Sequence, residues 1–156
     1  MTPKKLFRLF SLAEAVTWTL LIGGLILRAT VGVPSVAFTV VGGLHGAVFL
    51  TYAVIASITG VNQRGGFGRT VLGVVLAIVP YATIPFELYV QRSGKLEGDW
   101  RREHSGDARD DHWFDRLYRW FIIRPALITI VMFAVVTAIF AVLLMAGPPG
   151  GWPTND

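Results

Sequence analysis

Residues 35–60 have the sequence SVAFTVVGGLHGAVFLTYAVIASITG, which contains no Asp, Glu, Lys or Arg. The uncharged run extends beyond this stretch on both sides, from Ala29 to Gln63. An α-helix rises 1.5 Å per residue, so about 20 apolar residues cross the ~30 Å hydrocarbon layer of a bilayer. This stretch therefore predicts a transmembrane helix.

Further apolar blocks lie on either side of it, at residues 9–27, 70–91 and 125–146. The composition agrees with a membrane setting, because 53% of the residues are hydrophobic and only 15% are charged. Soluble domains usually carry about 25% charged residues. The sequence therefore predicts an all-α membrane protein with four transmembrane helices, whose partner is the lipid bilayer.

The first apolar block follows Lys4, Lys5 and Arg8, as the apolar region of a signal peptide would. However, the block is long enough to span a membrane, contains Glu14 and is not followed by a convincing small-residue cleavage site. We therefore interpret it as a retained membrane helix.

Composition and motifs also limit the possible chemistry. The chain has no cysteine, which excludes disulfides, thiolate metal sites and a cysteine nucleophile. The net charge of +4 is explained by basic residues beside the spans, and no basic domain with interleaved aromatics indicates nucleic-acid binding. No nucleophile–base pair or cofactor fingerprint is present, and His104 and His112 lack a recognised metal-ligand spacing. We expect no enzyme activity, cofactor, metal or nucleic-acid partner.

The long polar segment at residues 92–124 holds eight basic and seven acidic residues. Its second half predicts a helix from Asp107 to Arg124 that is capped by Asp107 and rich in aromatic and arginine side chains. A helix of this composition beside a span is typical of the membrane interface. The residues expected to contact the interface are Trp113, Tyr118 and Trp120.

The chain therefore divides into a three-span unit at residues 5–91, a connector at 92–124, a fourth span at 125–146 and a flexible tail at 147–156. Four spans place both termini on one side of the membrane and the connector on the other. A cytoplasmic N-terminus then puts five basic residues inside and nine outside, and this count favours the reverse topology. The three basic residues before the first span favour a cytoplasmic N-terminus, which we adopt.

Three ionisable side chains lie inside the predicted spans, namely Glu14, His45 and Glu87. A charge at the bilayer centre costs about 2.5–3.5 kcal/mol on insertion scales, so such residues are functional candidates. Counted at 1.5 Å per residue, Glu14 lies roughly 8 Å below the face that holds the N-terminus. His45 lies roughly 15 Å deep, and Glu87 roughly 6 Å from the opposite face. The three residues form a predicted ladder across the membrane.

Helical spacing places further residues beside each of them. Pro80 and Pro85 each remove a backbone donor, which predicts a kink or an unwound turn near Glu87. The alternative is a structural role, in which the carboxylates lie near the interface and the histidine bonds neighbouring helices. The predicted intramembrane polar cluster consists of Glu14, Thr17, His45, Tyr52, Pro80 and Glu87.

The second span carries small residues on one face, which allows another helix to approach closely. We expect this face to pack within the chain, although a second subunit is an open alternative. The predicted packing residues are Gly42, Gly46, Ala53 and Ser57.

Short motifs in the first three spans resemble the small bacterial integral membrane proteins named for a His-Gly motif, a family defined as a domain of unknown function. The resemblance covers about residues 5–91 and implies a bacterial inner-membrane setting, but no reaction. The connector and fourth span are additions to that three-span pattern. The motifs that carry the resemblance are Leu12-Ala13-Glu14-Ala15, Gly43-Leu44-His45-Gly46, Val79-Pro80-Tyr81 and Phe86-Glu87.

Two functions remain from the sequence. The first is a non-enzymatic accessory or stabilising subunit of a larger membrane complex, because few short spans and no inverted repeat leave little room for an alternating-access transporter. The second is a proton- or ion-handling protein that uses Glu14, His45 and Glu87, acting alone or as an oligomer.

Overall fold

The computed structural model describes residues 1–32 and 34–146, and all of the regular structure in these residues is helical. The predicted all-α class is therefore correct. The predicted flexible tail, residues 147–156, lies outside the described residues.

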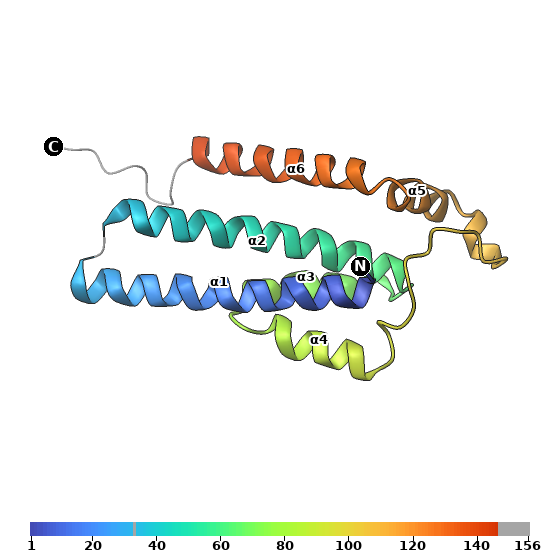
Figure 1. The fold of residues 1–156 in the computed structure, drawn as a ribbon, viewed down its shortest axis with the longest axis horizontal. Coiled ribbons are helices and arrows are strands. Elements are labelled where there is room, and N and C mark those ends of the chain that lie inside the picture. The colour runs from blue at the N-terminus through green and yellow to red at the C-terminus, as the bar shows by residue number, and fades with distance from the viewer. Residues whose placement is uncertain (33, 147–156) are drawn as a thin grey trace.

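Helices α1 (Pro3–Val31) and α2 (Ser35–Asn62) form a long antiparallel hairpin (Figure 1). The Thr2 side chain caps the start of α1 by accepting a hydrogen bond from the Lys5 N–H. Gly32 ends α1 with a φ of 75°, a conformation that glycine adopts without strain. Both helices are long and apolar enough to cross a membrane.

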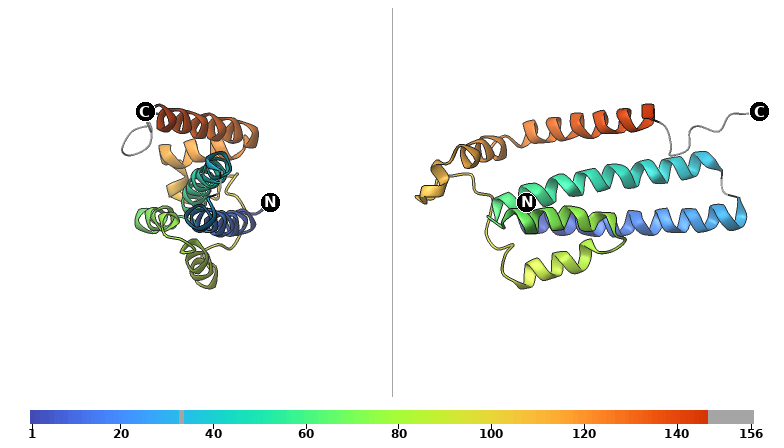
Figure 2. Two further views of the ribbon diagram at one scale, coloured as in Figure 1. Left: turned by 90° about the vertical axis from the view of Figure 1, so that its left-hand side faces the viewer. Right: turned by 180° about the vertical axis from the view of Figure 1, so that it is seen from behind.

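The predicted third span, residues 70–91, is wrong as a single crossing. The segment is divided into α3 (Phe67–Val75), a 3-10 turn (Leu76–Ile78) and α4 (Thr83–Arg92). Helix α3 runs back along α2, whereas α4 returns along α1 toward the chain's N-terminus (Figures 1 and 2). The contacts require this direction, since Thr83 bonds Ser11 and, farther along, Glu97 pairs with Lys4. The segment is therefore a helical hairpin that begins and ends at one end of the bundle.

Residues 79–82 form the turn of this hairpin. The Ala82 N–H donates to the Val79 carbonyl at 3.1 Å, and Tyr81 has a φ of 64°. Proline at the second position and a positive φ at the third match a type II turn. Pro85 falls in the first turn of α4, where a missing N–H is tolerated. The predicted unwound turn therefore occurs at Pro80, just before the helix that carries Glu87 begins, whereas α4 continues through Pro85.

After α4 the connector crosses the end of the bundle and leads to α5 (Trp113–Ile122) and α6 (Pro125–Ala146). The single helix predicted from Asp107 to Arg124 is wrong. Asp107 caps only a short 3-10 turn, Ala108–Asp111, and His112 is extended with a ψ of 139°. The His112 ring then caps α5 by accepting from the Phe114 N–H. Helices α5 and α6 are bent by 97° relative to one another.

The connector, α5 and the start of α1 lie at the same end of the molecule, whereas α6 runs toward the opposite end, where α1 ends and α2 begins (Figures 1 and 2). We call these the connector end and the distal end. The two ends of the described chain, Met1 and Ala146, are therefore at opposite ends of the bundle. This contradicts the predicted arrangement, in which both termini share one side and the connector lies on the other.

The hydrophobic core lies in the half of the bundle near the connector end, where α3 and α4 cover the α1–α2 pair. Its centre is Tyr52, which is fully buried and stacks on Phe7 with ring centroids 5.7 Å apart. Phe86 of α4 packs edge-on against Phe7 at 6.3 Å. The members of this core are Phe7, Tyr52, Ile55, Ala56, Ala77, Phe86, Val90 and Leu96.

Close helix approach occurs at Gly60, on the small-residue face of the second span, and at Gly73 of α3. A Cβ on Gly60 would overlap the Thr70 side chain, and a Cβ on Gly73 would lie 2.7 Å from the Phe86 ring. A Cβ on Gly42 would meet nothing within 4 Å. Ser57, also expected to pack closely, instead lines a groove between α2, α5 and α6. Helix α3 therefore approaches the core because Gly60 and Gly73 lack side chains.

We predict that Gly73→Ala destabilises the protein, because a methyl group there must displace the Phe86 ring. Overpacking a core costs roughly 1–3 kcal/mol. Gly68→Ala is the matched control, since a Cβ at this α3 glycine meets nothing within 4 Å. Thermal unfolding in mild detergent should show a lower Tm for Gly73→Ala alone, and Gly73→Ala/Phe86→Leu should recover part of the loss. Equal Tm values for the two single variants would contradict the packing.

Candidate functional site

An intramembrane acid–histidine pair joins α1 to α2. Glu14 is fully buried, and its Oε2 lies 3.5 Å from Nδ1 of His45. The Thr17 hydroxyl lies 3.0 Å from the same ring nitrogen and 3.4 Å from the Glu14 carboxylate. These three predicted residues are brought together, and a single proton can be shared between carboxylate and imidazole.

The indole of Trp18 holds this pair against the helical hairpin. Its ring lies 4.5 Å from that of His45, and its Nε1 donates to the Ala77 carbonyl at 3.2 Å. Ala77 belongs to the 3-10 turn, where backbone carbonyls lose helical partners. Trp18 therefore positions the histidine and satisfies the unwound backbone at the same time.

Two further polar residues, Tyr52 and Glu87, extend the site toward the connector end. The buried Tyr52 hydroxyl donates to the Gly73 carbonyl at 3.1 Å and lies within electrostatic range of both Glu14 and Glu87. Glu87 is only 3% exposed. It lies on the Glu14 side because α4 runs back along α1, so the depth predicted for it near the opposite face is wrong.

We call this group the acidic cluster. Among the described residues, one oxygen of each carboxylate, Glu14 Oε1 and Glu87 Oε1, is buried without a hydrogen-bond partner. Pro80, which the sequence also placed here, is exposed at the hairpin turn and lines no part of it. The structure adds the buried hydroxyl residues Ser11 and Thr83; helical spacing already places Thr83 on the Glu87 face, whereas Ser11 was not anticipated. The acidic cluster consists of Ser11, Glu14, Thr17, His45, Tyr52, Thr83 and Glu87.

The acidic cluster stops about halfway along the α1–α2 hairpin. Beyond Trp18 and His45 toward the distal end, Arg28 is the one ionisable residue in the described parts of the two helices. The predicted ladder across the membrane is therefore wrong, since the ionisable groups occupy one half of the bundle.

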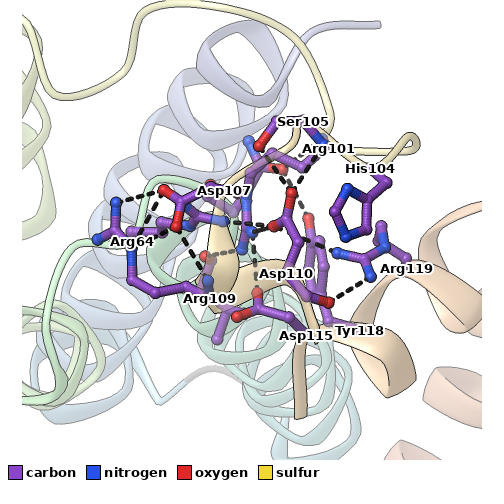
Figure 3. Close-up of polar contacts among 12 residues, drawn as sticks. Arg64, Arg101, His104, Ser105, Asp107, Arg109, Asp110, Asp115, Tyr118 and Arg119 are labelled. Carbon is purple, nitrogen blue, oxygen red and sulfur yellow. Dashed lines mark hydrogen bonds and ion pairs between the residues drawn. The ribbon is translucent and has the colours of Figure 1, made fainter. Parts of the chain in front are cut away.

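A second polar group, which we call the arginine cluster, closes the connector end (Figure 3). Asp110 is 1% exposed and contacts the guanidinium groups of Arg64, Arg101 and Arg119. The Ser105 N–H and hydroxyl also donate to it, both at 2.7 Å. These hydrogen bonds from Ser105, together with the charges of Arg64 and Arg119, lower the pKa of Asp110 from 3.8 to about 2.

Asp107 and Asp115 complete the arginine cluster. Asp107 bonds Arg64 and Arg109, both at 2.6 Å, and the Arg109 contact holds the pKa of this carboxyl well below its ordinary value. Asp115, on α5, pairs with Arg101 at 2.8 Å. The network joins the turn after α2 to the connector and to α5.

Asn62, the last residue of α2, makes a parallel set of contacts. Its side chain donates to the Asp99 carbonyl and accepts from the Arg101 N–H and the Tyr118 hydroxyl. Tyr118 is therefore turned inward and buried, unlike Trp113 and Trp120, which are 62% and 45% exposed. Of the predicted interfacial residues, the two tryptophans keep an outward face available to lipid headgroups.

Comparison with known protein families finds one that this chain matches. Residues 4–92 match the family described as Domain of unknown function (DUF3817). The protein belongs to this family. The resemblance predicted from the sequence is therefore confirmed, with nearly the same bounds. The DUF3817 region includes the whole acidic cluster and Arg64. Asp107 and Asp110, which pair with Arg64, and Arg101, which pairs with Asp110, follow that region in the chain.

A protein of Streptomyces coelicolor that bears the provisional name of a membrane protein is 32% identical over 91 residues. This match covers 58% of the present chain and 11% of the relative, so the chain spans only a small part of that protein's length. No solved structure matches the chain. A segment similar to part of this chain thus also occurs inside a much longer protein.

We predict that the arginine cluster makes stability acid-sensitive. A folded-state pKa of about 2 against an ordinary 3.8 means that the contribution of Asp110 to stability is complete above about pH 5 and is lost progressively as pH falls through 3.8 toward 2. Asp110→Asn should lower the Tm at pH 7 and flatten this acid step, as followed by thermal unfolding from pH 7 to pH 2.

Asp111→Asn is the control, because Asp111 is exposed and its one ion pair among the described residues is with His104, at 3.1 Å. It should behave like the wild type. Identical acid profiles for wild type and Asp110→Asn would show that the arginine cluster does not hold the connector.

Proposed function

We propose that this DUF3817 protein is a multi-pass protein of the bacterial inner membrane in which α1, α2 and α6 cross the bilayer. Two helices, α1 and α2, meet the length and hydropathy requirements alone, and α5 with α6 meets them as a bent pair. In this topology α3 and α4 form a re-entrant hairpin, and α5 lies along the interface. The four crossings expected from the sequence are replaced by three.

The distribution of basic residues supports a cytoplasmic connector end. Of the fourteen Lys and Arg residues, all except Arg28 lie at the connector end or in the helical turns beside it. Positive residues accumulate on the cytoplasmic side of membrane proteins. The conflict between the two orientation rules disappears, because both now favour a cytoplasmic N-terminus.

This topology is tested by labelling single cysteines, since the chain has none of its own. Val31→Cys and Met145→Cys, at positions 75% and 87% exposed near the distal end, should react with a membrane-impermeant maleimide in intact cells. Glu103→Cys, in the connector, should react only after lysis. Opposite labelling of Val31 and Met145 would indicate four crossings, and labelling of Glu103 alone in intact cells would reverse the orientation.

We propose that its role is that of an accessory subunit of a larger membrane assembly. The contrast between the two halves of the α1–α2 hairpin carries this proposal. Near Tyr52 the pair is covered by α3 and α4, whereas residues 25–31 of α1 are all exposed. A Cβ on Gly23 or Gly42 would meet nothing within 4 Å, so this surface can accept another helix closely. In the Streptomyces coelicolor relative the similar segment makes up 11% of the length, so it stands alongside further sequence.

A second candidate function is proton binding, and the acidic cluster favours it. Glu14 and His45 form a buried pair, and the two carboxylate oxygens without partners can accept a proton or a donor. The cluster ends at mid-depth, so this function would require either another subunit to complete a path or proton binding without transport. The accessory role needs no such addition and is the function we favour.

We predict that Gly42→Leu reduces co-purification of partner subunits from the native host in mild detergent while leaving the Tm unchanged. Leucine should cover the surface that a neighbouring helix approaches. Gly68→Leu, at an α3 glycine where a Cβ also meets nothing within 4 Å, should retain the partners.

The same proteins in liposomes separate the two functions. If the protein is an accessory subunit, liposomes that contain either the wild type or Glu14→Gln should transport no more protons than empty vesicles. A wild-type proton flux that Glu14→Gln abolishes, together with unchanged partner recovery in Gly42→Leu, would favour proton handling instead.

A further inference from the structure

Helix α6 packs loosely on the rest of the bundle and leaves an apolar groove on each side of its contact with α2. One groove, of about 340 Å³, is bounded by α1, α2 and α6, and Phe10, Ile55 and Met132 line its walls. The other, of about 320 Å³, lies between α2, α5 and α6 and is lined by Val61 and Phe121, among others. Both volumes are within the range of small-molecule sites.

The two grooves differ in the charge at their openings. The lining of the α1–α2–α6 groove includes Trp100 and Arg102 of the connector, whereas no charged residue lines the other groove. The Trp100 indole donates to the Met1 carbonyl at 2.8 Å, which holds the ring beside the groove. Tryptophan and arginine beside an apolar surface are the residues that meet lipid headgroups.

Arg102 differs from its neighbours in the connector. Arg101 and Arg109 are paired within the arginine cluster, whereas the exposed Arg102 guanidinium makes no ion pair or hydrogen bond to any residue that the structure describes. Its charge is therefore free for an anion that enters the groove from the connector end.

We propose that the α1–α2–α6 groove binds an anionic phospholipid, with an acyl chain between α2 and α6 and the phosphate on Arg102. The apolar walls fit a hydrocarbon chain, and the unpaired guanidinium fits the headgroup charge. The second groove has similar volume and walls but no cation, so it accepts a chain without selecting a headgroup. This proposal requires the membrane setting and does not depend on the accessory role.

The test uses the full chain in nanodiscs that contain phosphatidylglycerol and phosphatidylcholine, with native mass spectrometry of the retained lipid. The wild type should retain phosphatidylglycerol in preference to phosphatidylcholine. Arg102→Gln should reduce that preference roughly fivefold, the factor expected for one basic residue at a membrane surface. Arg116→Gln is the matched control, because Arg116 is exposed on α5 and lines neither groove.

A second pair of variants tests the groove itself. Thr129→Phe places a ring in the proposed groove and should reduce retained lipid of both kinds, whereas Val135→Phe faces the other groove and should keep the phosphatidylglycerol preference. Three outcomes would overturn the proposal: equal loss of preference in Arg102→Gln and Arg116→Gln, unchanged retention in Thr129→Phe, or no preference in the wild type. Displacement of phosphatidylglycerol by millimolar inorganic phosphate would show a site for a free anion instead.

Discussion

The unwound backbone at the tip of the α3–α4 hairpin is the constraint on which the rest of the fold depends. Non-helical backbone at membrane depth is tolerated only where protein surrounds it. Here Trp18 donates to Ala77, Tyr52 donates to Gly73, and Thr83 bonds Ser11. In each bond the partner from the α1–α2 pair, Trp18, Tyr52 or Ser11, lies in the half of that pair near the connector end. The hairpin therefore determines where the core lies and why the acidic cluster forms around it.

Much of the helical framework follows directly from hydropathy. The predicted block 125–146 coincides with α6, and α2 ends only two residues beyond the predicted 35–60. The block 70–91 misled because two short apolar helices joined by a turn can have the same composition as one long apolar helix. The feature of this block that indicates a turn is Pro80 followed by Tyr81. Gly73 is the second feature, because its missing side chain lets Phe86 of α4 pack close to α3.

The residues of the candidate site were predicted correctly only where the helices that carry them were also predicted correctly. Glu14, Thr17 and His45 lie on the two correctly predicted long helices, and helical spacing brought them together. The depth of Glu87 was wrong because it depends on the direction of α4. The arginine cluster was not anticipated, since Arg64 and Asp110 are 46 residues apart and meet only through the tertiary fold. No local spacing rule connects such residues.

The α1–α2 turn at the distal end has a consequence for how the chain enters the bilayer. If that end is the outer one, the only fixed charge that α1 and α2 carry across is Arg28, whose guanidinium lies 5.2 Å from the Phe38 ring centre. The pair can therefore insert first as a hairpin at low electrostatic cost. The re-entrant segment has no continuous helix of its own and must wait for the carbonyl and hydroxyl partners that this pair supplies. In the three-crossing topology proposed above, insertion and folding are thus separate, ordered steps.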